Sequence, residues 1–149
     1  MPQSFACLHY HLVFSTKHRA PLITPELQPH LYAYLGGLVR AEGGTLVAVG
    51  GVADHVHLLA RLGPTRAVAD VLRVVKTNSS RWVHEQAQRD GFGWQTGYAA
   101  FAVSLSQLAA VRGYVERQEE HHRAVTFQDE LRAMLRRHGF EPDERHLWE

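Results

Sequence analysis

The order in which strand-like and helix-like segments alternate is the feature that most limits how this chain can fold. Four segments are rich in aromatic and β-branched residues and predict strands: residues 8–15, 45–49, 55–61 and 98–103. Between them, apolar residues recur at helical spacing over residues 24–42 and 67–89. The order strand, helix, strand, strand, helix, strand is the split β-α-β pattern of ferredoxin-like folds. We therefore predict an α+β protein built on one such sheet.

Two further helices are expected after the last strand. Ser104 and Ser106 offer caps for a helix that ends near His122, and Thr126 begins another that stops at Gly139. In a ferredoxin-like sheet the two crossover helices cover one face, so the added helices are expected on the other. Nothing in the chain resembles a linker, an internal repeat or a low-complexity tract, and we expect a single domain over residues 1–149.

Composition excludes several classes of protein. The net charge is only +1, so the overall balance does not indicate nucleic-acid binding, and the single cysteine rules out a cysteine-based zinc cluster. No apolar run approaches the roughly 20 residues of a membrane span, and the N-terminus lacks the features of a signal peptide. We expect a cytoplasmic protein without a membrane partner.

His55 and His57 form a His-x-His pair in the third predicted strand. Residues two apart in a strand share a face, so both imidazoles project to one side, with Val56 and Leu58 on the other. Imidazole is the commonest metal-ligating side chain, which makes the pair half of a candidate metal site. However, a chain with 11 histidines in 149 residues is expected to hold such a pair by chance. It also contains His9 and His11 in the first predicted strand. They could contact the third strand and support its histidines, but ordinary strand packing is the simpler interpretation.

Tyr114 and Gln118 are four residues apart in the predicted third helix and therefore share a face. Taken alone, Tyr114 is expected at the boundary of the core and Gln118 on the surface. If this helix faces the third strand, two imidazoles and an amide oxygen form a three-ligand site suited to Mg²⁺ or Mn²⁺. A tyrosine beside such an ion is a nucleophile suited to a phosphodiester. We assign no chemistry to His121 and His122 and identify no general base for Tyr114.

Six segments resemble, in family order, the single-tyrosine (HUH) transposases of the IS200/IS605 type. They are residues 10–17, 54–59, 94–104, 114–122, 126–130 and 143–148. The resemblance implies that His55, His57 and Gln118 bind the metal and that Tyr114 is the nucleophile. It also implies an Mg²⁺- or Mn²⁺-dependent enzyme, working as a homodimer, that cuts and rejoins single-stranded DNA at hairpin-marked ends through a 5′-phosphotyrosine.

Several alternatives remain at this stage. A domesticated REP-associated tyrosine transposase shares the motifs, and a ferredoxin-like module that binds nucleic acid without cutting it is compatible with structural roles for Tyr114 and Gln118. A replication initiator or relaxase shares the chemistry but predicts additional domains. We favour the mobile-element enzyme. Candidate phosphate contacts are the basic residues Lys17, Arg19, Lys76 and Arg81, for which plain solvent exposure is the simpler interpretation.

Overall fold

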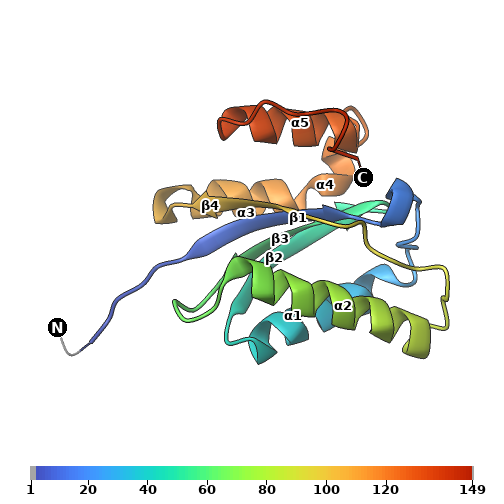
Figure 1. The fold of residues 1–149 in the computed structure, drawn as a ribbon, viewed down its shortest axis with the longest axis horizontal. Helices are drawn as coiled ribbons and strands as arrows, with labels where there is room; N and C mark the ends of the chain where they lie inside the picture. Colours follow the sequence, from blue (N-terminus) through green and yellow to red (C-terminus); the bar gives the residue numbers. More distant parts are fainter. Residues whose placement is uncertain (1–2, 149) are drawn as a thin grey trace.

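Four antiparallel strands form one sheet in the order β2-β3-β1-β4 in the computed structural model, which describes residues 3–148 (Figure 1). The strands are β1 (His9–Ser15), β2 (Thr45–Val52), β3 (His55–Arg61) and β4 (Ala99–Val103). The central strands β1 and β3 pair along their whole length, from His9 opposite Arg61 to Ser15 opposite His55. This arrangement confirms the predicted ferredoxin-like α+β fold.

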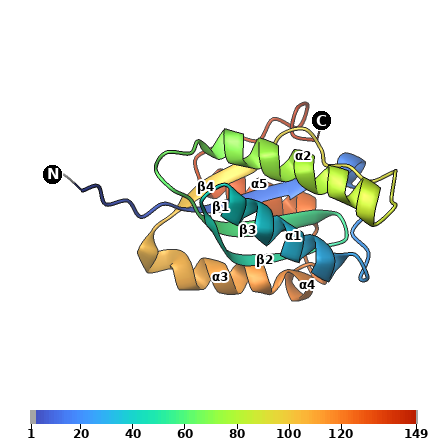
Figure 2. The same cartoon turned by 90° about the horizontal axis from the view of Figure 1, so that it is seen from below.

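The helices divide between the two faces of the sheet (Figures 1 and 2). One face is covered by α1 (Gln28–Ala41) and α2 (Val68–Gln86), and the other by α3 (Leu108–Glu116), α4 (Gln118–His121) and α5 (Phe127–Arg137). Two short 3-10 turns, η1 (Lys17–Arg19) and η2 (Leu105–Gln107), follow β1 and β4. Within residues 3–148, no helix combines the length and the apolar character that a membrane crossing requires.

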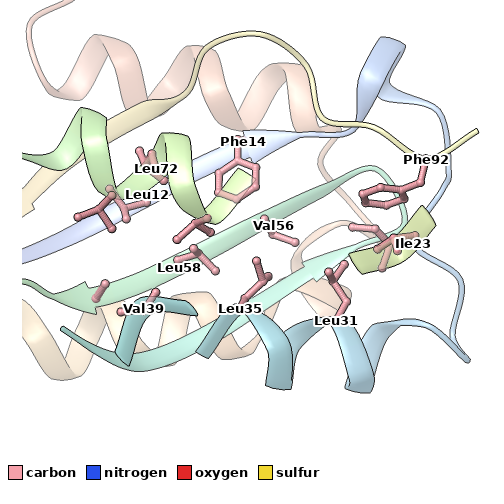
Figure 3. Packing of buried hydrophobic residues seen from close by; sticks show 14 of the residues in the cluster. Leu12, Phe14, Ile23, Leu31, Leu35, Val39, Val56, Leu58, Leu72 and Phe92 are labelled. Carbon is pink, nitrogen blue, oxygen red and sulfur yellow. The ribbon is translucent and has the colours of Figure 1, made fainter. Parts of the chain in front are cut away.

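The alternation of side chains along β3 separates two environments. Val56 and Leu58 enter the aliphatic core beneath α1 and α2, as Figure 3 shows. His55, His57 and Leu59 point to the opposite face, which α3 and α5 cover. The predicted two-residue periodicity of this strand is therefore confirmed.

The sequence alone favours a turn or bulge at Gly50 and Gly51. Both residues lie within β2, opposite His57 and Val56, and the register of this strand shifts between Leu46 and Ala48. The chain reverses at Ala53 and Asp54 instead. Glycine is needed at position 50 because a Cβ atom there would collide with the backbone carbonyl of Val115 in α3. The absence of a side chain thus lets α3 lie directly on β2, beside the histidines of β3.

The predicted third helix is interrupted. Its backbone leaves helical geometry at Arg117 (φ −103°, ψ 28°), which divides it into α3 and α4. The last helix is capped as predicted, since Thr126 accepts a hydrogen bond from the Asp129 backbone N–H at 3.2 Å. It ends before Gly139, which has a positive φ of 84°.

Candidate metal and tyrosine site

Each of the two β3 histidines has a hydrogen-bonding partner at its Nδ1 atom. Asp54 lies 2.8 Å from Nδ1 of His55, and Nε2 of His11 lies 2.7 Å from Nδ1 of His57. Both imidazoles are completely buried, and both turn Nε2 toward the α3–α5 side. Contacts of this kind orient metal-ligating histidines in known sites. Of the two interpretations of His11, the supporting contact with the third strand therefore fits the structure, whereas Nδ1 of His9 lies 3.7 Å from the Cys7 sulfur.

Gln118 reaches this cluster from the start of α4. Its Oε1 accepts a hydrogen bond from Nε2 of His55 at 3.1 Å, and the residue is only 1% exposed. The helical pattern taken alone had suggested a surface position, which is wrong. The packing of α3 against the glycines of β2 carries Gln118 inward, since its Cγ lies close to Gly50.

Tyr114 lies beside the same histidines. Its ring centroid is 5.8 Å from that of His57 and 6.1 Å from that of His11. Its hydroxyl donates a hydrogen bond to Glu130 of α5. The structure thus brings Tyr114, Gln118, His55 and His57 together in one chain.

Glu130 is the residue around which the cluster is arranged, and the sequence analysis missed it. Its Oε1 lies 2.9 Å from Nε2 of His57, 3.1 Å from Nε2 of His122 and 3.5 Å from Nε2 of His55. Its Oε2 accepts hydrogen bonds from the hydroxyl of Tyr114 and from Nε2 of Gln118. Oε1 therefore faces His55, His57 and His122, whereas Oε2 faces Tyr114 and Gln118.

Two signals in the sequence could have identified the missed residues. Glu130 interrupts the apolar stripe that Phe127, Leu131 and Met134 form along α5, and a carboxylate at a buried position is rare without a partner. His122 follows Gln118 by four residues and, as helix neighbours do, contacts it: its Nε2 lies 3.0 Å from Oε1 of Gln118. His121 also reaches the carboxylate, with Nε2 3.2 Å from Oε2 of Glu130.

The cluster shifts the protonation of its members in opposite directions. Burial lowers the pKa of His57 to about 4 and that of His11 to about 3, so both are neutral at pH 7. Burial would also lower the pKa of His55, but hydrogen bonds to Asp54 and Glu130 outweigh it and raise that pKa. Burial acts to raise the pKa of Glu130, yet the hydrogen bonds from its histidines hold it well below the usual range.

The same surroundings keep Tyr114 protonated. Burial, and next the hydrogen bond to the Glu130 carboxylate, raise the pKa of its phenol above the usual range. Burial and the neighbouring carboxylate therefore both favour the protonated phenol of Tyr114.

Three imidazoles and one carboxylate can jointly hold a cation. The donor atoms of His55, His57, His122 and Glu130 all lie within 4.8 Å of one another, and three of the four residues are buried. Mixed nitrogen and oxygen donors of this kind suit a divalent metal ion. Asp54 and His11 contact Nδ1 of His55 and His57 and so orient the two rings, with Nε2 of each directed into the cluster. The residues present therefore fit a metal site, while their types do not decide which metal binds.

The four predicted phosphate contacts lie on two elements, Lys17 and Arg19 on η1 and Lys76 and Arg81 on α2. Lys76 of α2 donates to the backbone carbonyl of Gln95 at 2.8 Å, so its charge supports the loop before β4. Arg19 stacks over the ring of Trp148, 5.0 Å from its centroid. Lys17 and Arg81 are exposed on different elements. DNA contacts by these residues remain a prediction.

The fold and the site define an α+β domain that carries a buried histidine–glutamate cluster, suited to a metal, with a tyrosine beside it. Residues 4–118 match the family described as "Transposase IS200 like", which spans well over half of the chain. The chain therefore belongs to the IS200-like transposase family. The match ends at Gln118, so His122 and Glu130 lie beyond it.

Individual relatives agree with this assignment. The chain is 27% identical over 119 residues to the ISDra2 transposase TnpA of Deinococcus radiodurans, covering 76% of this chain and 85% of the relative. It is 26% identical over 117 residues to the transposase for insertion sequence element IS200 of Salmonella typhimurium, covering 74% and 76%.

Solved structures show the same fold. The crystal structure of a candidate transposase from Deinococcus radiodurans R1 is 28% identical, with a TM-score of 0.62, over 77% of this chain and 93% of that chain. A REP-associated tyrosine transposase, solved bound to a REP hairpin, has a TM-score of 0.57 at 11% identity, over 76% of this chain and 67% of that chain. At that identity the second likeness concerns the fold alone.

Proposed function

We propose that this protein is a metal-dependent transposase that cuts and rejoins single-stranded DNA, with Tyr114 as the nucleophile. One observation carries the proposal: the Tyr114 hydroxyl and the imidazoles of His55 and His57 meet on the two oxygens of a single buried carboxylate, Glu130. A nucleophile and a set of metal donors thus share one site within one chain. Membership of the IS200-like transposase family gives this arrangement its substrate class.

The covalent step exchanges one phosphate ester for another. The phenolic oxygen of Tyr114 attacks the phosphorus of a phosphodiester, and the bond from phosphorus to the 3′ oxygen breaks. The phenol gives up its proton and the departing 3′ oxygen takes one up, so the products are a 5′-phosphotyrosine and a free 3′-hydroxyl. The phosphotyrosine keeps the ester bond, so a 3′-hydroxyl can reverse the attack and join a strand without ATP.

The residues that would hold the metal are His55 and His57, with Gln118 as the third ligand that the sequence analysis proposed. His122 and Glu130 offer further donors in the same cluster. A bound Mg²⁺ or Mn²⁺ would supply charge that polarises and orients the phosphate. Besides offering a metal donor, Glu130 would position the nucleophile, because its Oε2 accepts the hydrogen bond from the Tyr114 hydroxyl.

The proposed substrate is single-stranded DNA with hairpin-marked ends. The REP-associated relative of the same fold was solved with a REP hairpin, which supports a hairpin as the recognised feature. A homodimer and a mobile-element origin are part of the proposal, with a domesticated REP-associated enzyme as the alternative. Because Tyr114 contacts the site of its own chain, we propose that each protomer of such a dimer attacks DNA with its own tyrosine.

A direct test incubates the protein with hairpin-bearing single strands drawn from the DNA that flanks its own gene, with Mn²⁺ and with a chelator. We expect a covalent protein–DNA adduct only with the metal, located by mass spectrometry on the peptide containing Tyr114. The variant Tyr114→Phe should form none, whereas Tyr34→Phe, which alters a tyrosine stacked on Trp82 on the other face of the sheet, should behave as wild type. An undiminished adduct in Tyr114→Phe excludes Tyr114, and DNA binding that ignores chelator and never leads to cleavage favours a non-cleaving binding module.

A further inference from the structure

We propose that the cavity between α3 and α5 is a binding subsite for one unpaired DNA base next to the phosphodiester that Tyr114 attacks. This inference rests on the proposed function and adds the part of the substrate that this chain recognises directly. The cavity has a volume of about 700 Å³ and is bordered by Tyr114 and His11 at its inner end. A volume of this size falls within the range of small-ligand sites, roughly 300–1,000 Å³.

The cavity has an aromatic wall of the kind on which bases stack. The ring of His138 lies parallel to that of Phe101, with centroids 4.1 Å apart and an interplanar angle of 24°. Phe101 is buried in β4, whereas His138 is exposed and lines the cavity. The Nδ1–H of His138 donates to the carbonyl of Met134 at 2.7 Å, which fixes the ring and leaves Nε2 as an acceptor. Stacking on aromatic and histidine rings is the common way in which proteins hold unpaired bases.

The remaining walls separate an apolar interior from a charged rim. Val103, Val111 and Met134 line the interior, which suits the flat face of a base better than a hydrated phosphate. Arg137 also lines the cavity, and it forms no ion pair within residues 3–148. Its positive charge is close enough to act on the phenol of Tyr114. An arginine with no competing carboxylate, beside the nucleophile, suits a phosphate of the same strand.

The position of the cavity favours a nucleotide over a second protein chain. A strand whose phosphodiester reaches the Tyr114 hydroxyl must place an adjoining nucleotide close to the Tyr114 side chain, which borders the cavity. The cavity is also concave, with walls from β1, β4, α3 and α5 and the short turn η2, whereas protein interfaces are usually flatter and larger. Met134, Arg137 and His138 lie beyond residues 4–118, so this wall comes from a segment outside the family match.

Two adjacent alanines of α3 provide a matched pair of variants. Ala110 lines the cavity, whereas Ala109 is exposed and does not border it, so Ala110→Trp should fill the cavity and Ala109→Trp should leave it open. Each is combined with Tyr114→Phe, so that binding is measured without cleavage. The probe is a hairpin-bearing single strand with 2-aminopurine placed in turn at each position around the cleavage site.

We expect the fluorescence of 2-aminopurine to be quenched by stacking at one position next to the cleavage site. Ala110→Trp should remove that quenching and weaken DNA binding about tenfold, in line with the stacking energy of one base, while Ala109→Trp changes binding less than twofold. His138→Ala should act in the same direction as Ala110→Trp. Arg137→Gln should reduce the slope of log affinity against log salt by about 0.7, and the neighbouring Arg136→Gln, whose side chain does not border the cavity, should change it less.

Equal quenching at all positions, or equal behaviour of the two tryptophan variants, overturns the subsite. A change of oligomeric state in Ala110→Trp without a change in quenching also overturns it, because the cavity then belongs to an interface between copies. Unchanged Mn²⁺ binding shows that the variants are folded. Because quenching is measured without cleavage, failure of wild-type protein to form an adduct contradicts the proposed function alone.

Discussion

The two faces of this sheet are built from the same strands, and both bury hydrophobic side chains, but only one of them also buries a histidine–glutamate cluster. Toward α1 and α2, buried leucines such as Leu31, Leu58 and Leu72 form a continuous aliphatic core (Figure 3). On the other face, toward α3, α4 and α5, His57, the residue next to Leu58 in β3, contacts the buried carboxylate of Glu130. Successive residues of a strand point to opposite faces, so adjacent positions of β3 can serve different purposes: Leu58 packs in the hydrophobic core, and His57 belongs to the candidate metal site.

The polar face is stable only as a set. Burying an isolated carboxylate costs several kcal/mol. For Glu130 this cost is offset by hydrogen bonds from histidine, tyrosine and amide donors on three other elements. Each donor in turn is useful only while Glu130 is present. Variants on the two faces should therefore fail in different ways, which gives the following predictions in decreasing order of effect.

His57→Ala should abolish most of the catalytic activity without changing the fold. Loss of a buried metal donor beside Tyr114 should reduce the rate of adduct formation by about a thousandfold or more. The circular dichroism spectrum should stay close to wild type, and His30→Ala, which alters an exposed histidine of α1, serves as the control. Retention of even a tenth of the wild-type rate would remove His57 from the catalytic site.

Leu58→Ala should do the reverse at the adjacent position. Leu58 is completely buried between the sheet and the α1–α2 layer, so its truncation should lower the free energy of unfolding by about 2–5 kcal/mol. Chemical denaturation measures this loss. The rate of adduct formation per folded molecule should remain within a few-fold of wild type, and a much larger fall would mean that the two faces are coupled.

Gly50→Ala should disturb the site by displacing the backbone of α3. The added methyl group meets the carbonyl of Val115, so α3 must move away from β2 at an expected cost of about 1–3 kcal/mol. Isothermal titration with Mn²⁺ should show weaker binding, because Gln118 follows α3. The matched variant Gly37→Ala meets only the flexible end of Arg40 and should not weaken metal binding. Equal behaviour of the two variants contradicts the close approach of α3.

The metal-free protein should lose stability on acidification. His57 and His11 have pKa values of about 4 and 3 in the folded protein and return to the ordinary histidine value of 6.5 on unfolding. The unfolded chain then binds more protons below pH 6.5, so the free energy of unfolding falls as the pH drops. The raised pKa of His55 acts in the opposite direction.

We expect a net loss of about 2 kcal/mol between pH 7 and pH 5, measured by denaturation at each pH. His11→Gln should flatten this dependence, and the exposed His30→Gln should not. A slope that is unchanged in His11→Gln would show that this histidine is already charged in the folded protein.

Local patterns and the family resemblance predicted the parts of the site whose residues lie close together in the sequence. The strand period placed His55 and His57 on one face, and the family resemblance paired Gln118 with Tyr114. Glu130 could not be placed in the same way, because its role depends on α5 folding back over β1 and β4. The turn or bulge expected at Gly50 was wrong for a related reason: glycine is required there because α3, distant in the sequence, packs closely against it, and not because the chain changes direction.

The most direct test of the central claim asks whether one chain supplies both the tyrosine and the metal donors. Tyr114→Phe and His57→Ala proteins, carrying different affinity tags, are co-expressed, purified through both tags and mixed with hairpin DNA and Mn²⁺. We predict no adduct above the level of either variant alone, because neither chain contains a complete site. Restoration of adduct formation to a substantial fraction of the wild-type level would show that the tyrosine of one protomer serves the histidines of the other.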